Sequence, residues 1–164
     1  MSRTRRSYES GHKPKYLVVV DDTAEGDRAI YYASRRVSRS DAGMLMLRVI
    51  DTTDRNQQWL GVADIMRAEA YEEANAALDR ASGRANGVAG ITPERIIREG
   101  EWIEQILKLI DEDEDIAILV LAAGTGSDGP GPLVSAIART AGEFPIPLAV
   151  VPGHLTDEEL DALS

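Results

Sequence analysis

Residues 16–23 read YLVVVDDT, and this stretch decides the fold. The five residues from Tyr16 to Val20 form an uninterrupted apolar run that ends at two aspartates. Such a run is typical of a parallel strand covered on both faces, because a strand with one face in water alternates apolar and polar residues. The stretch therefore predicts a buried strand followed by a polar turn at Asp21 and Asp22.

Similar apolar runs recur along the chain, and segments with helical spacing separate them. Strands are predicted over residues 44–50, 95–98, 116–123 and 148–151, and helices over about 25–38, 62–85, 102–110 and 132–142. Strict alternation implies right-handed crossovers onto one sheet. We therefore predict an α/β fold, an open five-stranded parallel sheet with helices on both faces. The polar stretch Asp51–Gly61, which contains Trp59, is predicted to be a loop or lid.

The chain divides into three parts. A basic tail over residues 1–14 is expected to be a disordered, solubilising leader, and residues 15–152 form the predicted domain. The tail over residues 153–164 is expected to contain a short helix, because Thr156 and Glu159 have capping-box spacing ahead of Leu160. Either this segment or a second copy of the chain is expected to cover the apolar fifth strand, because an exposed edge invites pairing.

The composition excludes several kinds of chemistry. The 164 residues suffice for one domain, and the absence of cysteine excludes disulfides, thiolate zinc sites, iron–sulfur clusters and cysteine nucleophiles. His12 and His154 lie in no motif and are expected to be ordinary solvent-facing residues. The acidic run 112–115 is expected to be a solvated helix end, since its spacing matches no calcium loop. We predict no metal site and no catalytic residue.

The net charge and the length of the apolar runs limit the classes of partner that the chain is expected to bind. The net charge is −10, from 18 basic and 28 acidic residues, which repels nucleic acid and anionic lipid. The longest apolar run, residues 116–123, is far shorter than the roughly 18 to 20 residues that span a bilayer. No apolar stretch resembling a secretory signal follows the basic tail. Neither nucleic acid nor a membrane is expected as a partner, and a cytoplasmic location is expected.

Two loops are the candidates for a binding site, because ligands of open parallel sheets bind at the carboxyl ends of the strands. One loop is Asp21-Asp22-Thr23, and the other is the glycine-rich stretch 124–132 before the fourth helix. A glycine turn at a helix N-terminus can present N–H groups to phosphate, although a flexible connector has the same composition. The stretch matches neither a Walker loop nor the dinucleotide fingerprint. Asp128 would oppose phosphate unless a metal bridged the two.

Together, residues 18–23, 47–51, 98–101 and 135–151 resemble a universal stress protein domain, over about residues 15–152. The resemblance implies a five-stranded parallel sheet of strand order 3-2-1-4-5, and a homodimer formed by pairing of the fifth strands. Family members that bind ATP or AMP share the signature G-x2-G-x9-G-(S/T) after the fourth strand.

This chain departs from that signature. Counting back from Pro145 places Ala123, Gly126, Val134 and Ser135 at its four fixed positions, with a loop two residues shorter. An alternative alignment, which starts at Gly126 and keeps the spacing of the signature, places Arg139 at the third glycine. It leaves too little helix before Pro145. Because a β-branched residue at the third glycine would crowd a phosphate, AMP or another adenosine ligand is favoured over ATP with Mg²⁺.

The resemblance also assigns roles to residues. It implies that Asp21 accepts a hydrogen bond from adenine, that the backbone of Val49 contacts the base, and that Gly126 and Ser135 contact ribose and phosphate. The rest of the implied phosphate loop is Gly124, Thr125 and Ser127. For Asp21 a second interpretation stays open, a carboxylate that caps the following helix.

Two functions remain. The first is a dimeric stress-response module that binds an adenine nucleotide as a sensor or regulator. The alternative is a family member without nucleotide that acts through contacts with a protein partner, by the 51–61 loop or the dimer edge. Efficient phosphoryl transfer is not expected, because the glycine loop holds no lysine or arginine. At most, slow ATP hydrolysis fits the residues present.

Overall fold

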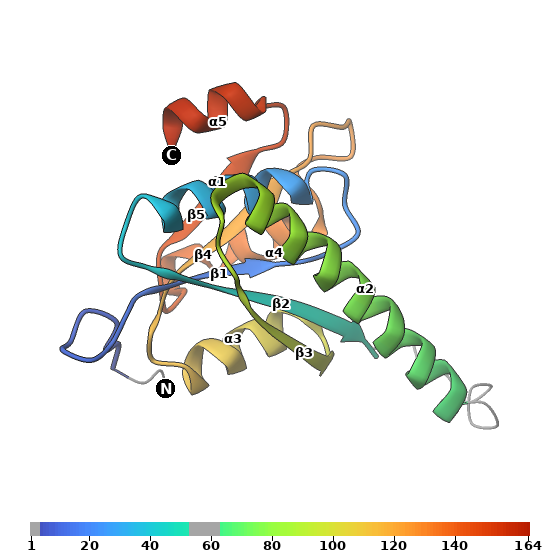
Figure 1. Cartoon of the computed structure of the whole chain (residues 1–164). Coiled ribbons are helices and arrows are strands. Elements are labelled where there is room, and N and C mark those ends of the chain that lie inside the picture. Colours follow the sequence, from blue (N-terminus) through green and yellow to red (C-terminus); the bar gives the residue numbers. More distant parts are fainter. Residues whose placement is uncertain (1–3, 53–62) are drawn as a thin grey trace.

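A computed structural model describes residues 4–52 and 63–164 (Figure 1). The strands are β1 (Lys15–Val19), β2 (Gly43–Asp51), β3 (Glu94–Gly100), β4 (Ile116–Ala123) and β5 (Leu148–Pro152). The helices are α1 (Gly26–Ser38), α2 (Ala63–Ala89), α3 (Trp102–Glu112), α4 (Pro132–Arg139) and α5 (Asp157–Leu163), with a 3-10 turn η2 (Ala141–Glu143) before β5. Of the predicted 51–61 loop, Asp51 and Thr52 are described, and the rest, including Trp59, lies outside the described residues.

The five strands form one parallel sheet in the order β3-β2-β1-β4-β5, as predicted. The buried strand β1 lies at its centre, where Leu17 pairs with Leu45 of β2 and Leu119 of β4. The connection after β1 leads to β2 on one side of the sheet, and the connection after β4 leads to β5 on the other side. The two connections therefore diverge between β1 and β4. That divergence is the point at which open α/β sheets bind ligands.

Alternate side chains of the strands enter two separate cores. Val18 and Met46 lie on the face covered by α1, α2 and α5, whereas Leu17 and Leu47 lie on the face covered by α3 and α4. All four side chains are fully buried. Burial on both faces explains why these strands read as continuous apolar runs.

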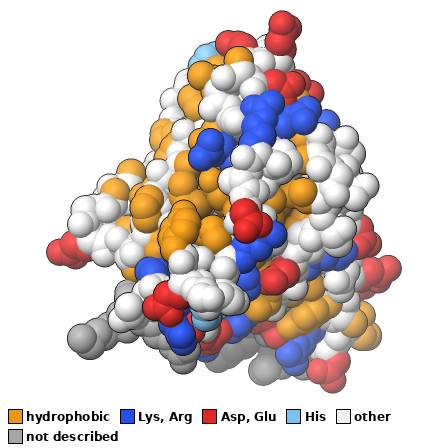
Figure 2. All heavy atoms as spheres, turned by 60° about the vertical axis from the view of Figure 1, so that its left-hand side comes forward, with side chains coloured by type: hydrophobic (Ala, Val, Ile, Leu, Met, Phe, Trp, Pro, Cys, Tyr) orange, Lys and Arg blue, Asp and Glu red, His pale blue; other side chains and the backbone are white. Residues whose placement is uncertain are grey.

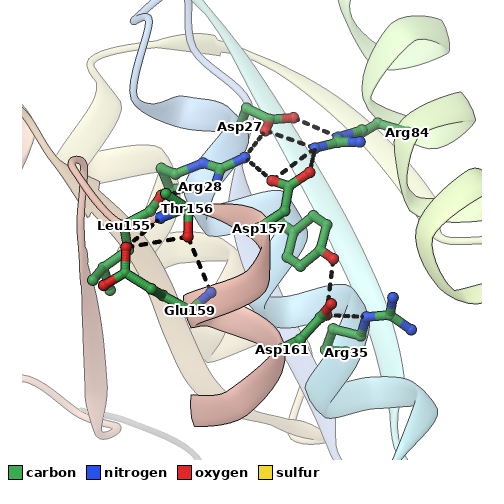
Figure 3. Close-up of polar contacts among 10 residues, drawn as sticks. Asp27, Arg28, Arg35, Arg84, Leu155, Thr156, Asp157, Glu159 and Asp161 are labelled. Atoms are coloured by element: carbon green, nitrogen blue, oxygen red, sulfur yellow. Dashed lines mark hydrogen bonds and ion pairs between the residues drawn. The ribbon is translucent and has the colours of Figure 1, made fainter.

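Helix α5 packs on α1 through a cluster of ion pairs (Figure 3). Arg28 of α1 contacts Asp157 at 2.6 Å and donates to the carbonyl of Leu155, and Arg84 of α2 contacts Asp27 at 2.8 Å. The predicted capping box of Thr156 and Glu159 begins the helix. A second group joins Arg35 and Tyr31 to Asp161. We call the first four charged residues, Asp27, Arg28, Arg84 and Asp157, the clamp.

The clamp shifts the titration of its own carboxyl groups. Burial alone raises the pKa of Asp27, but hydrogen bonds from Arg84 and Arg28 outweigh burial and hold that pKa below its ordinary value. The hydrogen bond from Arg28 is the main reason that the pKa of Asp157 is lowered. Both carboxylates are therefore more stable as anions in the folded chain than in the unfolded chain.

The basic segment before β1 differs from the disordered leader expected from its composition. Its described part, residues 4–14, lies against the loop between α3 and β4. Arg5 donates to the carbonyls of Asp113 and Ile116, and His12 Nδ1 lies 2.6 Å from Asp115 Oδ1. The acidic run 112–115 supplies two of these acceptors, the carbonyl of Asp113 and the carboxylate of Asp115, so it pairs with the segment, and His12 is not simply solvent-facing.

The C-terminal helix does not cover the sheet edge formed by β5. Helix α5 packs on α1, and Val150 of β5 remains 46% exposed. Figure 2 shows hydrophobic side chains gathered on one face of the molecule. Among the described residues, no helix is both long and apolar enough to cross a bilayer.

Candidate functional site

Two cavities flank the loops that follow β1 and β4. The first, of about 440 Å³, is lined by the β1 loop, the end of β2 and the start of α3, and it includes Asp21, Asp51, Trp102 and Leu133. The second, of about 640 Å³, is lined by the glycine loop before α4 and the start of α1. We call them the base cavity and the loop cavity. Both lie within the size range of small-molecule sites.

Asp21 shapes the turn after β1. Its Oδ1 accepts hydrogen bonds from the backbone N of Thr23 at 3.1 Å and from Thr23 Oγ1 at 2.6 Å. Helix α1 begins later, with Glu25 as N-cap and no side-chain capping bond. Asp21 is therefore not the cap of α1, and its carboxylate lies in the wall of the base cavity.

A buried arginine of the neighbouring strand β2 forms hydrogen bonds to the same loop. Arg48 of β2 is 7% exposed, and its guanidinium donates to the carbonyl of Val20 at 3.1 Å and to Asp22 at 3.0 Å. Charged hydrogen bonds to two consecutive parts of a loop restrict its movement. The turn that carries Asp21 is thus tied to the neighbouring strand.

The glycine loop is closed by its own backbone. The N–H of Gly124 donates to the carbonyl of Pro130 at 3.0 Å, and the N–H of Gly129 donates to Gly126 at 3.1 Å. Gly131, with a φ of +106°, makes the turn into α4, a conformation that side chains other than glycine rarely adopt. A glycine therefore stands where the loop enters the helix.

Val134, expected at the third glycine position of the signature, lies at the start of α4. It lies in the first turn of α4, three residues after Gly131, where it packs against the core on the α3 and α4 side. Val134 also lines a small cavity of about 50 Å³ together with Asp21 and Glu25. A β-branched side chain therefore stands at this part of the site.

Glu25 enters the loop cavity from the start of α1. A Cβ built on Gly124 would lie 2.7 Å from Glu25 Oε1, and one built on Gly153 would lie 3.0 Å from Glu25 Cβ. Gly124 makes room for the carboxylate of Glu25, whereas a Cβ on Gly153 would first meet the backbone carbonyl of Ala123. Glu25 and Asp128 are the two charged residues in the cavity's described lining.

The structure brings most of the predicted site residues together. Asp21 lines the base cavity, while Gly124, Thr125, Gly126 and Ser135 line the loop cavity. Ser127 is exposed and does not line either cavity. The side chain of Val49 is 2% exposed in the core, so only its backbone is available for the expected contact.

Sequence reasoning missed two residues of the site, Glu25 and Arg48. Glu25 reads as an ordinary acidic residue at a helix start, and Arg48 as a charge within an apolar strand. An arginine inside an otherwise apolar strand is a recognisable sign of a buried partner, since buried charges are paired. Trp102 also lines the base cavity.

Residues 14–152 match the family model described as the universal stress protein family. The chain belongs to the universal stress protein family. The match covers the five strands and helices α1 to α4, and α5 lies beyond it. No curated protein matches the chain at a significant level.

Solved structures of the family share its fold. The universal stress protein UspA from Lactobacillus plantarum is 20% identical with a TM-score of 0.70, over 84% of this chain and 97% of that one. A universal stress protein family protein from Arabidopsis thaliana with AMP bound is 17% identical, with a TM-score of 0.59 over 88% and 94%. The Archaeoglobus fulgidus universal stress protein in complex with dAMP is 14% identical, with a TM-score of 0.56 over 84% and 96%. At these identities the likeness shows the fold alone.

Proposed function

We propose that this universal stress protein is a non-catalytic module that binds an adenine nucleotide, AMP or ATP with Mg²⁺, or another adenosine ligand, as a sensor or regulator in the cytoplasm. The observation that carries the proposal is the position of Asp21, which lies in a cavity of about 440 Å³ at the point where the sheet connections diverge. A carboxylate there accepts a hydrogen bond from the exocyclic amine of adenine. Family members with AMP and dAMP bound support the same ligand class.

The walls of the base cavity suit a flat heterocycle. Trp102, Ile103 and Leu133 supply apolar and aromatic surface, and Asp21 supplies a hydrogen-bond acceptor. Ligand sites commonly combine such surface with a few placed polar groups. The base is therefore proposed to lie against Trp102 with its amine toward Asp21.

Calorimetric titration with AMP and with ATP, with and without Mg²⁺, tests this function. We expect micromolar binding that is lost in Asp21→Ala. The matched control is Asp41→Ala, because the Asp41 side chain is fully exposed and removes the same charge elsewhere. If neither these nucleotides nor adenosine produces heat at millimolar concentration with folded protein, ligand binding is refuted.

The exposed edge of the sheet bears on the dimer that is part of this function, and the alternative, action through a protein partner, would use the same edge. Val150 on the edge strand β5 is 46% exposed, and pairing with a second copy of the chain would cover it. We propose a homodimer formed at this edge. Sedimentation equilibrium should show a dimer that Val150→Asp dissociates, and a monomeric wild-type chain would contradict it.

A further inference from the structure

The charge of the loop cavity sets which adenosine ligands fit it, an inference that rests on the proposed function. Glu25 is half-buried beside Gly124, and no hydrogen bond or ion pair to its carboxylate is present among residues 4–52 and 63–164. Asp128 lines the same cavity. A carboxylate beside a ligand favours a cation or a hydrogen-bond donor and repels an anion.

No basic residue in the described lining offsets this charge. The described wall of the loop cavity holds the carboxylates of Glu25 and Asp128 and no lysine, arginine or histidine. In the base cavity, Asp51 and Glu101 have interactions of their own. Arg48 compensates Asp22 from the sheet side. Phosphate sites, in contrast, combine backbone N–H groups with a lysine or arginine.

The backbone donors of the glycine loop are also reduced. The N–H groups of Gly124 and Gly129 already bond within the loop. Helix α4 begins with Pro132, which has no N–H, so its first turn offers one donor fewer to an anion. Basic side chains and free backbone N–H groups normally hold a phosphate, and both are reduced around the glycine loop.

From these observations we infer that the site selects an adenosine ligand whose 5′ end is uncharged or positively charged, and discriminates against the phosphates of nucleotides. The base and ribose occupy the base cavity, and the 5′ substituent extends toward Glu25. An ammonium group at that position can donate hydrogen bonds to the carboxylate. Each added phosphate brings further negative charge toward Glu25 and Asp128.

Four probes with the same base and ribose test the inference: 5′-amino-5′-deoxyadenosine, adenosine, AMP and ATP, titrated by calorimetry without Mg²⁺. We expect affinity to fall in that order, with adenosine binding roughly tenfold more tightly than AMP at low salt. Added salt should strengthen AMP binding, since it screens repulsion, and leave adenosine binding nearly unchanged.

Glu25→Gln is the deciding variant. It should abolish the preference for the amino nucleoside over adenosine and raise AMP affinity severalfold. Glu72→Gln is the matched control, because Glu72 is exposed on α2 and its loss changes the net charge equally. The control should reproduce the wild-type order.

The outcomes separate the inference from the proposed function. AMP or ATP binding as tightly as adenosine, or a Glu25→Gln variant with the wild-type order, would overturn the inference and leave the adenosine site standing. Binding of none of the four probes would overturn both.

Discussion

Two carboxylates at the start of α1 lie only two residues apart and have opposite surroundings. Asp27 lies between Arg28 and Arg84 in the clamp, whereas Glu25 faces the glycines of the loop cavity. The chain places basic residues where they hold α5 against α1, and none in the described walls of the loop cavity. In the clamp the carboxylate is paired with arginines that hold the helices together, whereas in the loop cavity we propose that the carboxylate selects the ligand.

The largest expected effect concerns the apolar anchor of α5. Leu160 is 1% exposed within the core on the α1 side, so Leu160→Ala should lower the free energy of unfolding by about 2–4 kcal/mol. Chemical denaturation measures the loss. Leu163→Ala, on the same helix but 64% exposed, should cost less than about 0.5 kcal/mol. Equal losses would show that α5 is not anchored by burial.

Replacing the buried arginine should have the next largest effect. Arg48→Met keeps most of the side-chain volume but removes the bonds to Val20 and Asp22, at a cost of about 1–3 kcal/mol. The same variant should weaken adenosine binding, because it loosens the turn that carries Asp21. Arg139→Met, at an exposed position of α4, is the control. Unchanged stability and binding would refute the anchoring role.

The two neighbouring carboxylates can be compared directly. Asp27→Asn should destabilise the chain by about 1 kcal/mol, a modest loss because the Asp27 side chain is 39% exposed. Glu25→Gln should change stability by less than about 0.5 kcal/mol, because no partner is lost. Thermal melts of the two variants under identical conditions measure the difference. If Glu25→Gln lost as much stability as Asp27→Asn, the two carboxylates would not differ in their contribution to stability, contrary to this account.

The smallest expected effect is the dependence of the clamp on pH. The folded pKa values of Asp27 and Asp157 lie below the ordinary value of 3.8, so their stabilisation is present above that pH. It is lost as the pH falls below 3.8 through the folded pKa values. Acid denaturation of Asp27→Asn should therefore show a shallower loss than the wild type. An identical acid profile would contradict the assignment.

The order of elements could be predicted because the central strands β1 and β4 are largely buried on both faces. The apolar runs at 16–20 and 116–123 carry this burial directly in their residue types, and they correspond to β1 and β4. The docking of α5 could not be predicted in the same way. Its capping box and Leu160 indicate a helix, but the arginines that receive it lie 73 to 129 residues earlier in the chain.

The candidate site was predictable in place but only partly in detail. Asp21 and the glycine loop follow their strands in sequence, so the shared sheet edge brings them together. The contribution of Glu25 depends on its contact with Gly124 across α1 and β4, which no local pattern encodes.

The most direct test of the central claim is a backbone amide NMR titration of the full chain with adenosine. If the site lies where the sheet connections diverge, the signals of residues 21–25 and 124–131 should shift together and saturate with one dissociation constant. Asp21→Asn should suppress both sets of shifts. Shifts confined to the β5 edge, or none at either loop at millimolar adenosine, would contradict the claim.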